Sequence, residues 1–290
     1  MECDVVPVGP YRMPRGGRDG VMHRSPDGVL SRLMHVDAEA VIVRAWPRSG
    51  SVRIRAEAPS HQTAATAVER MRFALGTDHD LRPFHRAFRR DRLLGPIMRR
   101  KPWLRPFRRP EPFEALAWAV CEQLIDGARA VDIQRGLVAR HGRRSACGTL
   151  RDVPCADAVS RLSPAEVERC GMSPKRALTL VRAAREVASG RADLSRHEPA
   201  WRRLRTISGI GPWTIECLAY HGQGRDDQIP AGDLSYIKLV GRLAGLGRRA
   251  TEDEVREFFA AYAPFAALAG TYLVHAAHGE VSPRSSFSGR

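Results

Sequence analysis

The stretch that decides the fold is Leu204-Arg-Thr-Ile-Ser-Gly-Ile-Gly-Pro-Trp-Thr-Ile-Glu-Cys-Leu218, followed by Ile229-Pro-Ala-Gly-Asp233. It places a Gly-Ile-Gly turn between two apolar helical patterns, and a single carboxylate after a Pro-Ala-Gly bend. Gly209 and Gly211 allow tight or left-handed backbone angles and leave amide N–H groups free at the start of the next helix. Free amides at a helix N-terminus bind anions such as a DNA phosphate. The stretch therefore pairs a predicted phosphate grip with a nearby acid, which favours chemistry on nucleic acid.

The composition fits a globular protein with a polyanionic partner. The 290 residues include 47 Lys and Arg against 32 Asp and Glu, which gives a formal net charge of +15, and 43% of them are hydrophobic. A chain of this length can hold two domains and a substantial core. The charge favours nucleic acid as a partner, and by itself it is equally compatible with a role in solubility. Lysine occurs only at Lys101, Lys175 and Lys238, and this dominance of arginine suggests a GC-rich bacterial genome.

No feature of the sequence indicates secretion, a membrane span or a metal centre. The N-terminal Met-Glu-Cys-Asp lacks a basic segment followed by an apolar core, and no stretch reaches about 18 uninterrupted apolar residues. We therefore expect no membrane contact and a cytoplasmic, nucleoid-associated protein. The six cysteines form no C-x-x-C pair, and His275-x-x-His278 has no further obvious ligands. Neither a disulfide framework nor a metal site is predicted.

The order of the patterns predicts an α+β fold. Turn-separated runs at 28–34, 40–45 and 51–56 are β-branched or alternating, and they predict an antiparallel meander. The segments 63–75 and 80–100 have the apolar spacing of helices. A small antiparallel or mixed β domain with helices is therefore expected first in the chain.

A basic connection at 98–110, with three prolines, marks a domain boundary. It could touch DNA, although a solvated linker explains it as well. From 112 onward the pattern is helical almost throughout, with an interruption near Asp126-Gly127. We expect a loose N-terminus, an N-terminal α+β domain, an all-α bundle and a disordered tail, at 1–20, 21–105, 106–280 and 281–290 respectively.

At 204–233 the sequence resembles the helix-hairpin-helix DNA glycosylases, closest to the 3-methyladenine DNA glycosylase II group. Pro112–Leu124 is similar to that group's helix leading into a Gln-Leu or Gln-Gln turn, and Gly171–Ala177 is similar to its glycine-containing turn before another helix. The resemblance spans about residues 20–280, and the hairpin with the acid behind it is its specific part. The chain has no four-cysteine cluster after Asp233, which argues against the iron–sulfur branches of these enzymes.

The resemblance implies that Asp233 is the catalytic aspartate. Cleavage of an N-glycosidic bond develops oxocarbenium charge on the sugar, which a nearby carboxylate stabilises. An acid at a helix N-terminus stays ionised, because the amides and the helix dipole favour its charged form. The alternative is that Asp233 is only the N-cap of a helix at 234–246. Asp226 and Asp227 lie in the polar loop before Pro230 and match the pattern less well.

Trp213 stands where strand-cleaving glycosylases carry a lysine that forms a Schiff base with the sugar. The resemblance therefore implies a monofunctional hydrolase, with Lys238 only a remote candidate for amine chemistry. It also places Trp213 beside the extrahelical base, where its ring would stack on an alkylated purine. Packing of the hairpin against the bundle is an equally good explanation of Trp213.

The lining of the base pocket departs from the family pattern. Cys217 stands where the group often has a second pocket aromatic, and Tyr272-Leu-Val-His275, which includes Val274, stands where a tryptophan is common. The pocket is therefore roomier or differently lined, and the range of substrates stays open.

A base inside a duplex must be flipped out, and the gap that it leaves must be filled. The resemblance assigns this wedge to Leu124, which follows Gln123; the alternative is that Leu124 belongs to the apolar face of the preceding helix. The amides around Gly209, Ile210 and Gly211 should hold a phosphate beside the lesion. In related proteins the hairpin carbonyls also coordinate a monovalent cation, and no other cofactor is expected.

Together these features imply a monomeric DNA N-glycosylase of base excision repair that acts on double-stranded DNA with damaged bases. Alkylated purines of the 3-methyladenine type are already good leaving groups, so stacking plus Asp233 would suffice. Two alternatives stay open. One is a glycosylase of the same fold for another lesion, such as an oxidised purine. The other is a non-catalytic helix-hairpin-helix DNA-binding protein.

Overall fold

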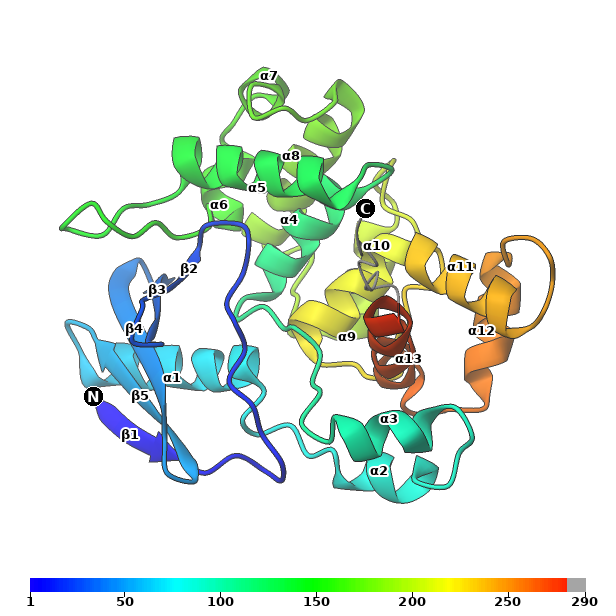
Figure 1. Ribbon diagram of the computed structural model, residues 1–290. Coiled ribbons are helices and arrows are strands. Elements are labelled where there is room, and N and C mark those ends of the chain that lie inside the picture. The colour runs from blue at the N-terminus through cyan, green and yellow to red at the C-terminus, as the bar shows by residue number, and fades with distance from the viewer. Residues whose placement is uncertain (281–290) are drawn as a thin grey trace, which may run out of the picture.

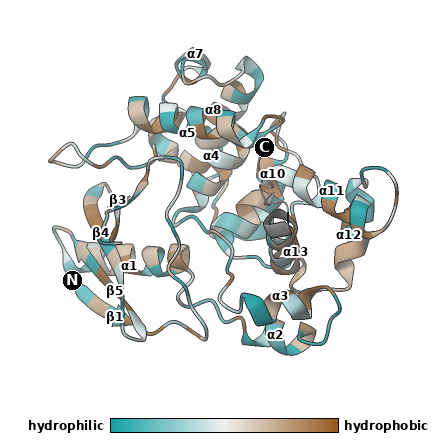
Figure 2. Cartoon of the chain, in the orientation of Figure 1, coloured by the Kyte–Doolittle hydropathy of each residue, from teal (hydrophilic) through white to brown (hydrophobic). Residues whose placement is uncertain are grey.

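The computed structural model describes residues 1–280, with side chains up to residue 277, and arranges them as a small sheet domain beside a larger helical body (Figure 1). The predicted α+β architecture, an antiparallel N-terminal sheet followed by a helical bundle, is confirmed. Figure 2 shows hydrophobic residues along the strands and interior helices and hydrophilic residues on the outer turns. Up to residue 280, no helix has the length and apolar character needed to span a bilayer. The tail predicted at 281–290 lies outside the described residues.

The sheet has five strands in the order β1-β5-β4-β3-β2, and all neighbours are antiparallel. Side chains at alternate positions of a strand point to the same face, and helix α1 (His61–Leu75) covers the apolar face. Val41 and Val43 of β4 are fully buried there with Met71 of α1. The strands are β1 (Glu2–Val5), β2 (Met22–Arg24), β3 (Leu30–Val36), β4 (Glu39–Arg48) and β5 (Ser51–Glu57).

The N-terminus belongs to the sheet. β1 pairs with β5 along its whole length, and the Tyr11 hydroxyl donates to the carbonyl of Leu75 at 3.1 Å. The guanidinium of Arg105 donates to the carbonyl of Val8 at 2.8 Å. The expectation of a loose segment at 1–20 is therefore wrong, because hydrogen bonds to distant parts of the chain hold a stretch whose local composition favours no regular structure.

The helical pattern at 80–100 is broken into two short helices, α2 (Arg82–Phe88) and α3 (Leu94–Arg100). The break comes at Asp91, whose carboxylate accepts hydrogen bonds from the amides of Leu93 and Leu94 at 2.9 and 2.7 Å. These hydrogen bonds hold two amides at the start of the second helix, and they compete with continuation of the first.

Both short helices pack on the helical body rather than on the sheet. The ring of Phe84 in α2 meets that of Tyr272 in α13 (Ala266–Glu280), with centroids 5.2 Å apart. Leu94 and Ile97 of α3 lie in the same core. The sequence assigned these residues to the N-terminal domain at 21–105, and their packing places them instead with the C-terminal helices.

The helical body has two cores. Helix α4 (Pro112–Glu122) is buried on nearly all sides and forms the centre of the first, and the predicted interruption at Asp126 is confirmed because that residue caps α5. The other helices of the first core are α5 (Gly127–His141), α6 (Ala156–Ser160), α7 (Pro164–Glu168), α8 (Pro174–Ala188), α9 (His197–Leu204) and α10 (Pro212–Cys217). The second core is rich in aromatic side chains and joins α2, α3 and α13 to the π-helical turn η1 (Leu218–Gly222), α11 (Leu234–Leu243) and α12 (Glu252–Ala260).

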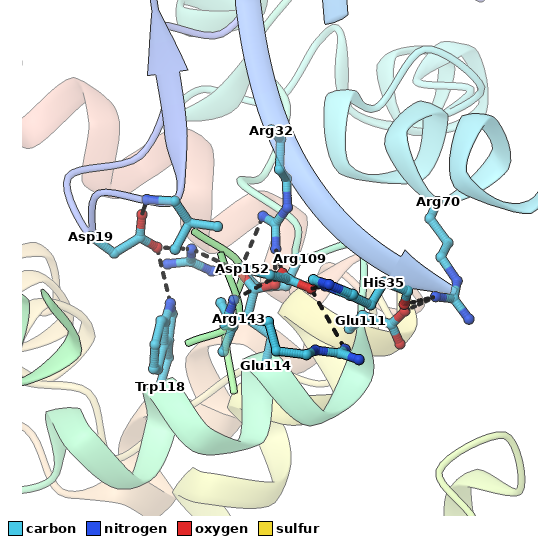
Figure 3. Close-up of polar contacts among 12 residues, drawn as sticks. Asp19, Arg32, His35, Arg70, Arg109, Glu111, Glu114, Trp118, Arg143 and Asp152 are labelled. Carbon is cyan, nitrogen blue, oxygen red and sulfur yellow. Dashed lines mark hydrogen bonds and ion pairs between the residues drawn. The ribbon is translucent and has the colours of Figure 1, made fainter. Parts of the chain in front are cut away.

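A buried cluster of charges joins the sheet domain to the helical body (Figure 3). Arg32 of β3 and Glu114 of α4 form an ion pair whose side chains are 2% and 1% exposed. Asp19 accepts hydrogen bonds from Arg109 and from Nε1 of Trp118 in α4, the latter at 3.0 Å. Removal of one partner from such a buried pair typically costs about 3–5 kcal/mol. The cluster therefore fixes how the two parts sit against each other.

Candidate functional site

The Gly-Ile-Gly turn forms the corner of a helical hairpin between α9 and α10. Gly209 has φ +94°, and a Cβ at this position would lie 2.5 Å from Oγ1 of Thr179, so only glycine fits. Ile210 is 5% exposed and anchors the turn in the first core. Gly211 is exposed, and apart from its chain neighbours no atom of the described residues lies within 4 Å of the position that its Cβ would take. The backbone at Gly211 is therefore open to an approaching ligand.

The amides and the carbonyls of this turn differ in whether they form hydrogen bonds. Among the described residues, the N–H groups of Gly209 and Gly211 donate to no protein acceptor, and such groups suit a phosphate. The carbonyls of Ser208 and Gly209 each lie within hydrogen-bond distance of a side-chain donor, at 2.9 Å from Thr179 Oγ1 and 2.7 Å from Gln123 Nε2. Carbonyl oxygens retain a second lone pair and are donors of the type that a monovalent cation takes, so the hairpin fits such an ion by donor type. Groups of three or more His, Cys, Asp or Glu that could hold a metal do not occur in the described part of the chain.

Asp233 caps α11 and keeps one oxygen unengaged. Its Oδ1 accepts a hydrogen bond from the amide of Ser235 at 2.7 Å, and its own amide donates to the carbonyl of Pro230 at 2.8 Å. Within the described residues Oδ2 accepts no hydrogen bond, and the side chain is half-buried. Asp233 is thus an N-cap, as the purely structural alternative requires. It also offers a carboxylate oxygen to a ligand.

The two competing carboxylates are engaged. Asp226 accepts a hydrogen bond from Arg108 at 2.8 Å and lies 2.7 Å from Nε2 of His79. Asp227 accepts two hydrogen bonds from Arg225, each of 2.9 Å. These partners neutralise both charges, which leaves Asp233 as the carboxylate of this segment with a free oxygen in the described structure.

Trp213, in the first turn of α10, packs beside the turn that carries Asp233. Its Cβ lies 3.5 Å from the position that a Cβ at Gly232 would take, and its half-buried ring has Nε1 buried without a partner in the described structure. Cys217 follows four residues later on the same helix face and is 6% exposed. Burial raises the pKa of the Cys217 thiol well above its ordinary value, so this side chain is neutral.

The turn between α4 and α5 approaches the hairpin. Nε2 of Gln123 donates to the carbonyl of Gly209 at 2.7 Å and to Oγ1 of Thr214 at 2.8 Å. Leu124 is fully exposed, at 104%, and has the left-handed φ of +56°. The two residues therefore separate: Gln123 ties its turn to the hairpin, and Leu124 projects into solvent instead of joining the apolar face of α4.

Two titratable residues near Asp233, Glu122 and His221, are not predicted from the sequence, because no motif marks them. The charge of Asp233 acts on both Glu122 and His221. Although part of the Glu122 side chain reaches solvent, the protein packed around it raises the pKa of this carboxyl, and Gln134 donates to it at 2.9 Å. Burial lowers the pKa of His221 to about 4, and its Nδ1 lies 2.8 Å from the carbonyl of Phe107. The π-helical turn η1 determines the position of His221, and hydrophobic periodicity does not predict such a turn.

A hollow of about 340 Å³ lies between α11 and α13, beside Asp233. Leu234 and Ser235 line it on one side and Val274 on the other, and Val274 presents an aliphatic side chain where the family pattern favours an aromatic. Lys238 also lines this hollow, which brings the remote candidate for amine chemistry close to the site. A larger cavity, of about 700 Å³, lies between the sheet domain and the helical body, and none of the predicted site residues lines it.

Comparison with known protein sequences assigns these features to a family. The family model described as "HhH-GPD superfamily base excision DNA repair protein" matches residues 117–264. The DNA-3-methyladenine glycosylase of Bacillus subtilis is 29% identical over 205 residues, which cover 68% of this chain and 67% of that protein. The DNA-3-methyladenine glycosylase 1 of Schizosaccharomyces pombe is 29% identical over 178 residues, which cover 58% of this chain and 74% of that protein.

Solved structures share the fold. A 3-methyladenine DNA-glycosylase from Archaeoglobus fulgidus superposes with a TM-score of 0.81 at 21% identity, over 98% of this chain and 100% of that one. An 8-oxoguanine glycosylase/lyase from Clostridium acetobutylicum, in complex with double-stranded DNA, reaches 0.72 at 16% identity, over 91% of this chain and 89% of that one. At these identities the likeness concerns the fold alone. The same fold accompanies names that refer to alkylated and to oxidised purines.

Proposed function

The chain belongs to the HhH-GPD superfamily of base excision DNA repair proteins, and from that membership we propose that it is a monofunctional DNA N-glycosylase. It flips a damaged purine of the alkylated, 3-methyladenine type out of duplex DNA and hydrolyses the bond between base and sugar. It acts as a monomer on nucleoid DNA and leaves an abasic site. The names of the sequence relatives from Bacillus subtilis and Schizosaccharomyces pombe support this substrate class.

The observation that carries the proposal is a carboxylate with a free oxygen beside an aromatic wall. Asp233 uses Oδ1 for the helix cap and leaves Oδ2 without a hydrogen bond from the described residues. Trp213 packs against the same turn, within reach of its backbone at Gly232. A purine stacked on the face of Trp213 would bring its sugar toward Asp233, since the two side chains flank one turn.

The reaction needs little beyond this arrangement. As the bond between C1′ and the base nitrogen breaks, its electron pair leaves with the base and positive charge builds on the sugar. The Asp233 carboxylate stabilises that charge. A water molecule then forms the new bond to C1′, and its proton passes to Asp233 or to solvent. Because alkylation has already made the base cationic, it departs as a neutral molecule and no general acid is required.

Base flipping is assigned to the parts that surround the pocket. Leu124 fills the gap left in the duplex, which its complete exposure supports. The free amides of Gly209 and Gly211 hold a phosphate beside the lesion. Cys217 and Val274 are smaller than the aromatic side chains of the family pattern, which would leave more room for the base.

Release of 3-methyladenine from methylated duplex DNA tests the proposal. Asp233→Asn keeps the shape of the site and removes its charge, and we expect base release to fall by about 10²–10³-fold while binding to a duplex with an abasic-site analogue persists. Asp227→Asn is the matched control, because it makes the same change on a carboxylate already occupied by Arg225. It should keep wild-type release.

Other outcomes separate the alternatives. Undiminished release by Asp233→Asn would overturn its catalytic role. Retained DNA binding without release by the wild type would favour a non-catalytic DNA-binding protein. A panel of lesions in which only oxidised purines are released would favour the other substrate class. Borohydride trapping of a covalent DNA adduct would contradict the monofunctional reaction, and loss of the adduct in Lys238→Ala would locate its amine.

A further inference from the structure

A basic groove lies between the N-terminal sheet domain and α13. It is a cavity of about 510 Å³ between the loop after β1, the connection after α3 and the C-terminal half of α13. In Figure 1 the dark blue loop and the teal connection both run between the sheet and α13. The connection is the arginine- and proline-rich segment that the sequence marks as a domain boundary. We define the basic groove by four cations and two aromatic rings: Arg12, Arg15, Lys101, Arg105, Trp103 and Phe107.

Within the described residues, the protein does not neutralise the positive charge of the basic groove. No acidic residue among them lines it, and none of its four cations forms an ion pair with them. Acids at the end of α1 and in the following loop are already engaged: Asp78 lies 2.9 Å from the guanidinium of Arg72, and Asp80 lies 2.8 Å from that of Arg82. A concave surface with one sign of charge concentrates ligands of the opposite sign. The basic groove is therefore suited to an anion.

Arg105 forms the floor of the basic groove. Its guanidinium donates to the backbone carbonyls of Pro10 at 2.6 Å and Val8 at 2.8 Å, and its Nε is buried without a partner in the described structure. Carbonyl dipoles hold this cation in place without cancelling its charge. Burial lowers the pKa of Arg105, which reflects the cost of keeping a cation there without a carboxylate.

The basic groove also offers aromatic surface. Trp103 is half-buried, and the guanidinium of Arg12 lies 5.9 Å from the centre of its ring. Phe107 is half-buried as well. Proteins that bind single-stranded nucleic acid combine cations that follow the phosphates with aromatic rings on which bases stack. A duplex does not present a base face in this way, so the pairing of Trp103 with exposed arginines favours an unpaired strand.

The basic groove begins close to the candidate active site. Val274 and His275 are adjacent on α13, and they line different hollows: Val274 the hollow beside Asp233, and His275 the basic groove, where it lies 3.5 Å from Nζ of Lys101. Only the C-terminal half of α13 separates the two. A strand held at Asp233 can therefore continue across this helix into the basic groove.

We propose that the basic groove is a second DNA-binding site, which holds an unpaired stretch of strand with its phosphates on Arg12, Arg15 and Lys101 and a base on Trp103. The N-terminal region thereby takes part in DNA recognition, and single-stranded flanks become part of the substrate. The proposal rests on the proposed function in taking the polymer to be DNA and in leading its strand from Asp233 into the basic groove. Binding of an oligonucleotide to the basic groove does not itself require Asp233, so the two proposals can fail separately.

Binding of a short oligothymidylate to the full chain tests the proposal, with tryptophan fluorescence and anisotropy as readouts. Loss of stacking in Trp103→Ala should weaken binding about 10- to 100-fold, and Trp103→Phe, which keeps a ring, should restore most of it. The double variant Arg12→Ala/Arg15→Ala should flatten the dependence of log Kd on log salt by about 1.4, because each lost phosphate contact on a single strand contributes about 0.7. Both arginines are exposed, so the fold should tolerate this change.

The matched control is Arg48→Ala/Arg92→Ala, which removes the same charge from two exposed arginines outside the basic groove. The proposal is overturned if the control pair weakens oligothymidylate binding as much as the groove pair, because bulk charge then explains the effect. It is also overturned if the groove variants bind like the wild type, or if thymidine monophosphate binds as tightly as the oligonucleotide. Base release from a blunt methylated duplex should be unchanged in the groove variants. If neither the wild type nor any variant releases the base, while the groove variants still weaken oligothymidylate binding, the proposed function is contradicted. The proposal for the basic groove is then still supported.

Discussion

Truncation of Leu124 should separate DNA binding from folding more cleanly than any other change in the site. The side chain is 104% exposed, so it contributes almost no packing to the free protein. If it enters the duplex as the base leaves, its apolar surface is buried only in the complex. Leu124→Ala removes carbon worth about 2 kcal/mol of burial, which corresponds to roughly thirtyfold weaker binding to a duplex with an abasic-site analogue. The free energy of unfolding should change by less than about 0.5 kcal/mol.

The backbone at this position adds a second, opposite expectation. Leu124 has φ +56°, a left-handed conformation that costs a residue with a Cβ about 1–2 kcal/mol. Leu124→Gly removes this strain, and the greater freedom of glycine in the unfolded chain offsets about 0.4–1 kcal/mol of the gain. We expect the glycine variant to unfold at the same or a slightly higher urea concentration than the wild type, although it loses the wedge entirely.

Fluorescence anisotropy with the abasic duplex, single-turnover release of 3-methyladenine and urea unfolding measure these effects together. Leu93→Ala is the control, since Leu93 is a partly exposed leucine, at 36%, in the break between α2 and α3. The reasoning is refuted if Leu124→Ala binds the abasic duplex as tightly as the control. It is also refuted if either Leu124 variant loses more than about 1 kcal/mol of stability, because the side chain would then be part of the core.

Three further expectations follow from individual contacts. Gln123→Ala removes two hydrogen bonds to the hairpin, of 2.7 and 2.8 Å, so the free energy of unfolding measured in urea should fall by about 2 kcal/mol; an unchanged value would contradict the bracing role. Gly209→Ala forces a Cβ to within 2.5 Å of Thr179 and should lower both stability and duplex affinity, whereas Gly211→Ala, with open space around it, should affect stability much less; equal losses would refute the steric argument. His221 has a folded pKa of about 4, below the ordinary value of about 6.5. The unfolded state therefore binds more protons between these pH values, and about 2–3 kcal/mol of stability should be lost as the pH falls from about 6.5 to about 4. His221→Gln should flatten that dependence in urea titrations at several pH values, and an unchanged slope would exclude His221 as its source.

The sequence predicts those parts of the site that depend on residues close together along the chain. Gly209 and Gly211 predict a turn, because glycine adopts backbone angles that other residues avoid. Asp233 follows a bend and precedes a helical pattern, which is the usual sequence position of an N-cap. The meander of β3, β4 and β5 is equally local, since alternation and turn residues occur within one stretch of chain.

What the sequence does not predict depends on contacts between distant residues. β1 is a strand because it pairs with β5, and its own composition favours no such structure. α2 and α3 join the helical body because Phe84 meets Tyr272, and the pairing of Arg32 with Glu114 has no local pattern at all. A hydrophobic period reports which face of an element is apolar, and it does not identify the partner that covers that face.

Helix α10 connects the separate parts of the site, and this explains why a short, irregular helix carries so much of it. Thr214 of α10 accepts a hydrogen bond from Gln123, beside the exposed leucine, and so fixes the turn between α4 and α5. Glu216 of α10 accepts one from the amide of Ala231 at 3.2 Å and so fixes the turn that leads to Asp233. One rigid element therefore positions all four parts of the proposed site, instead of four independent loops. These parts are the wedge, the phosphate-binding amides, the aromatic ring and the carboxylate. Electrostatic stabilisation is effective only when the charged group is already in place as charge develops on the substrate. On this reasoning the hairpin does more than grip DNA, because the helix that presents the phosphate site also holds Asp233 at its distance from the flipped nucleotide.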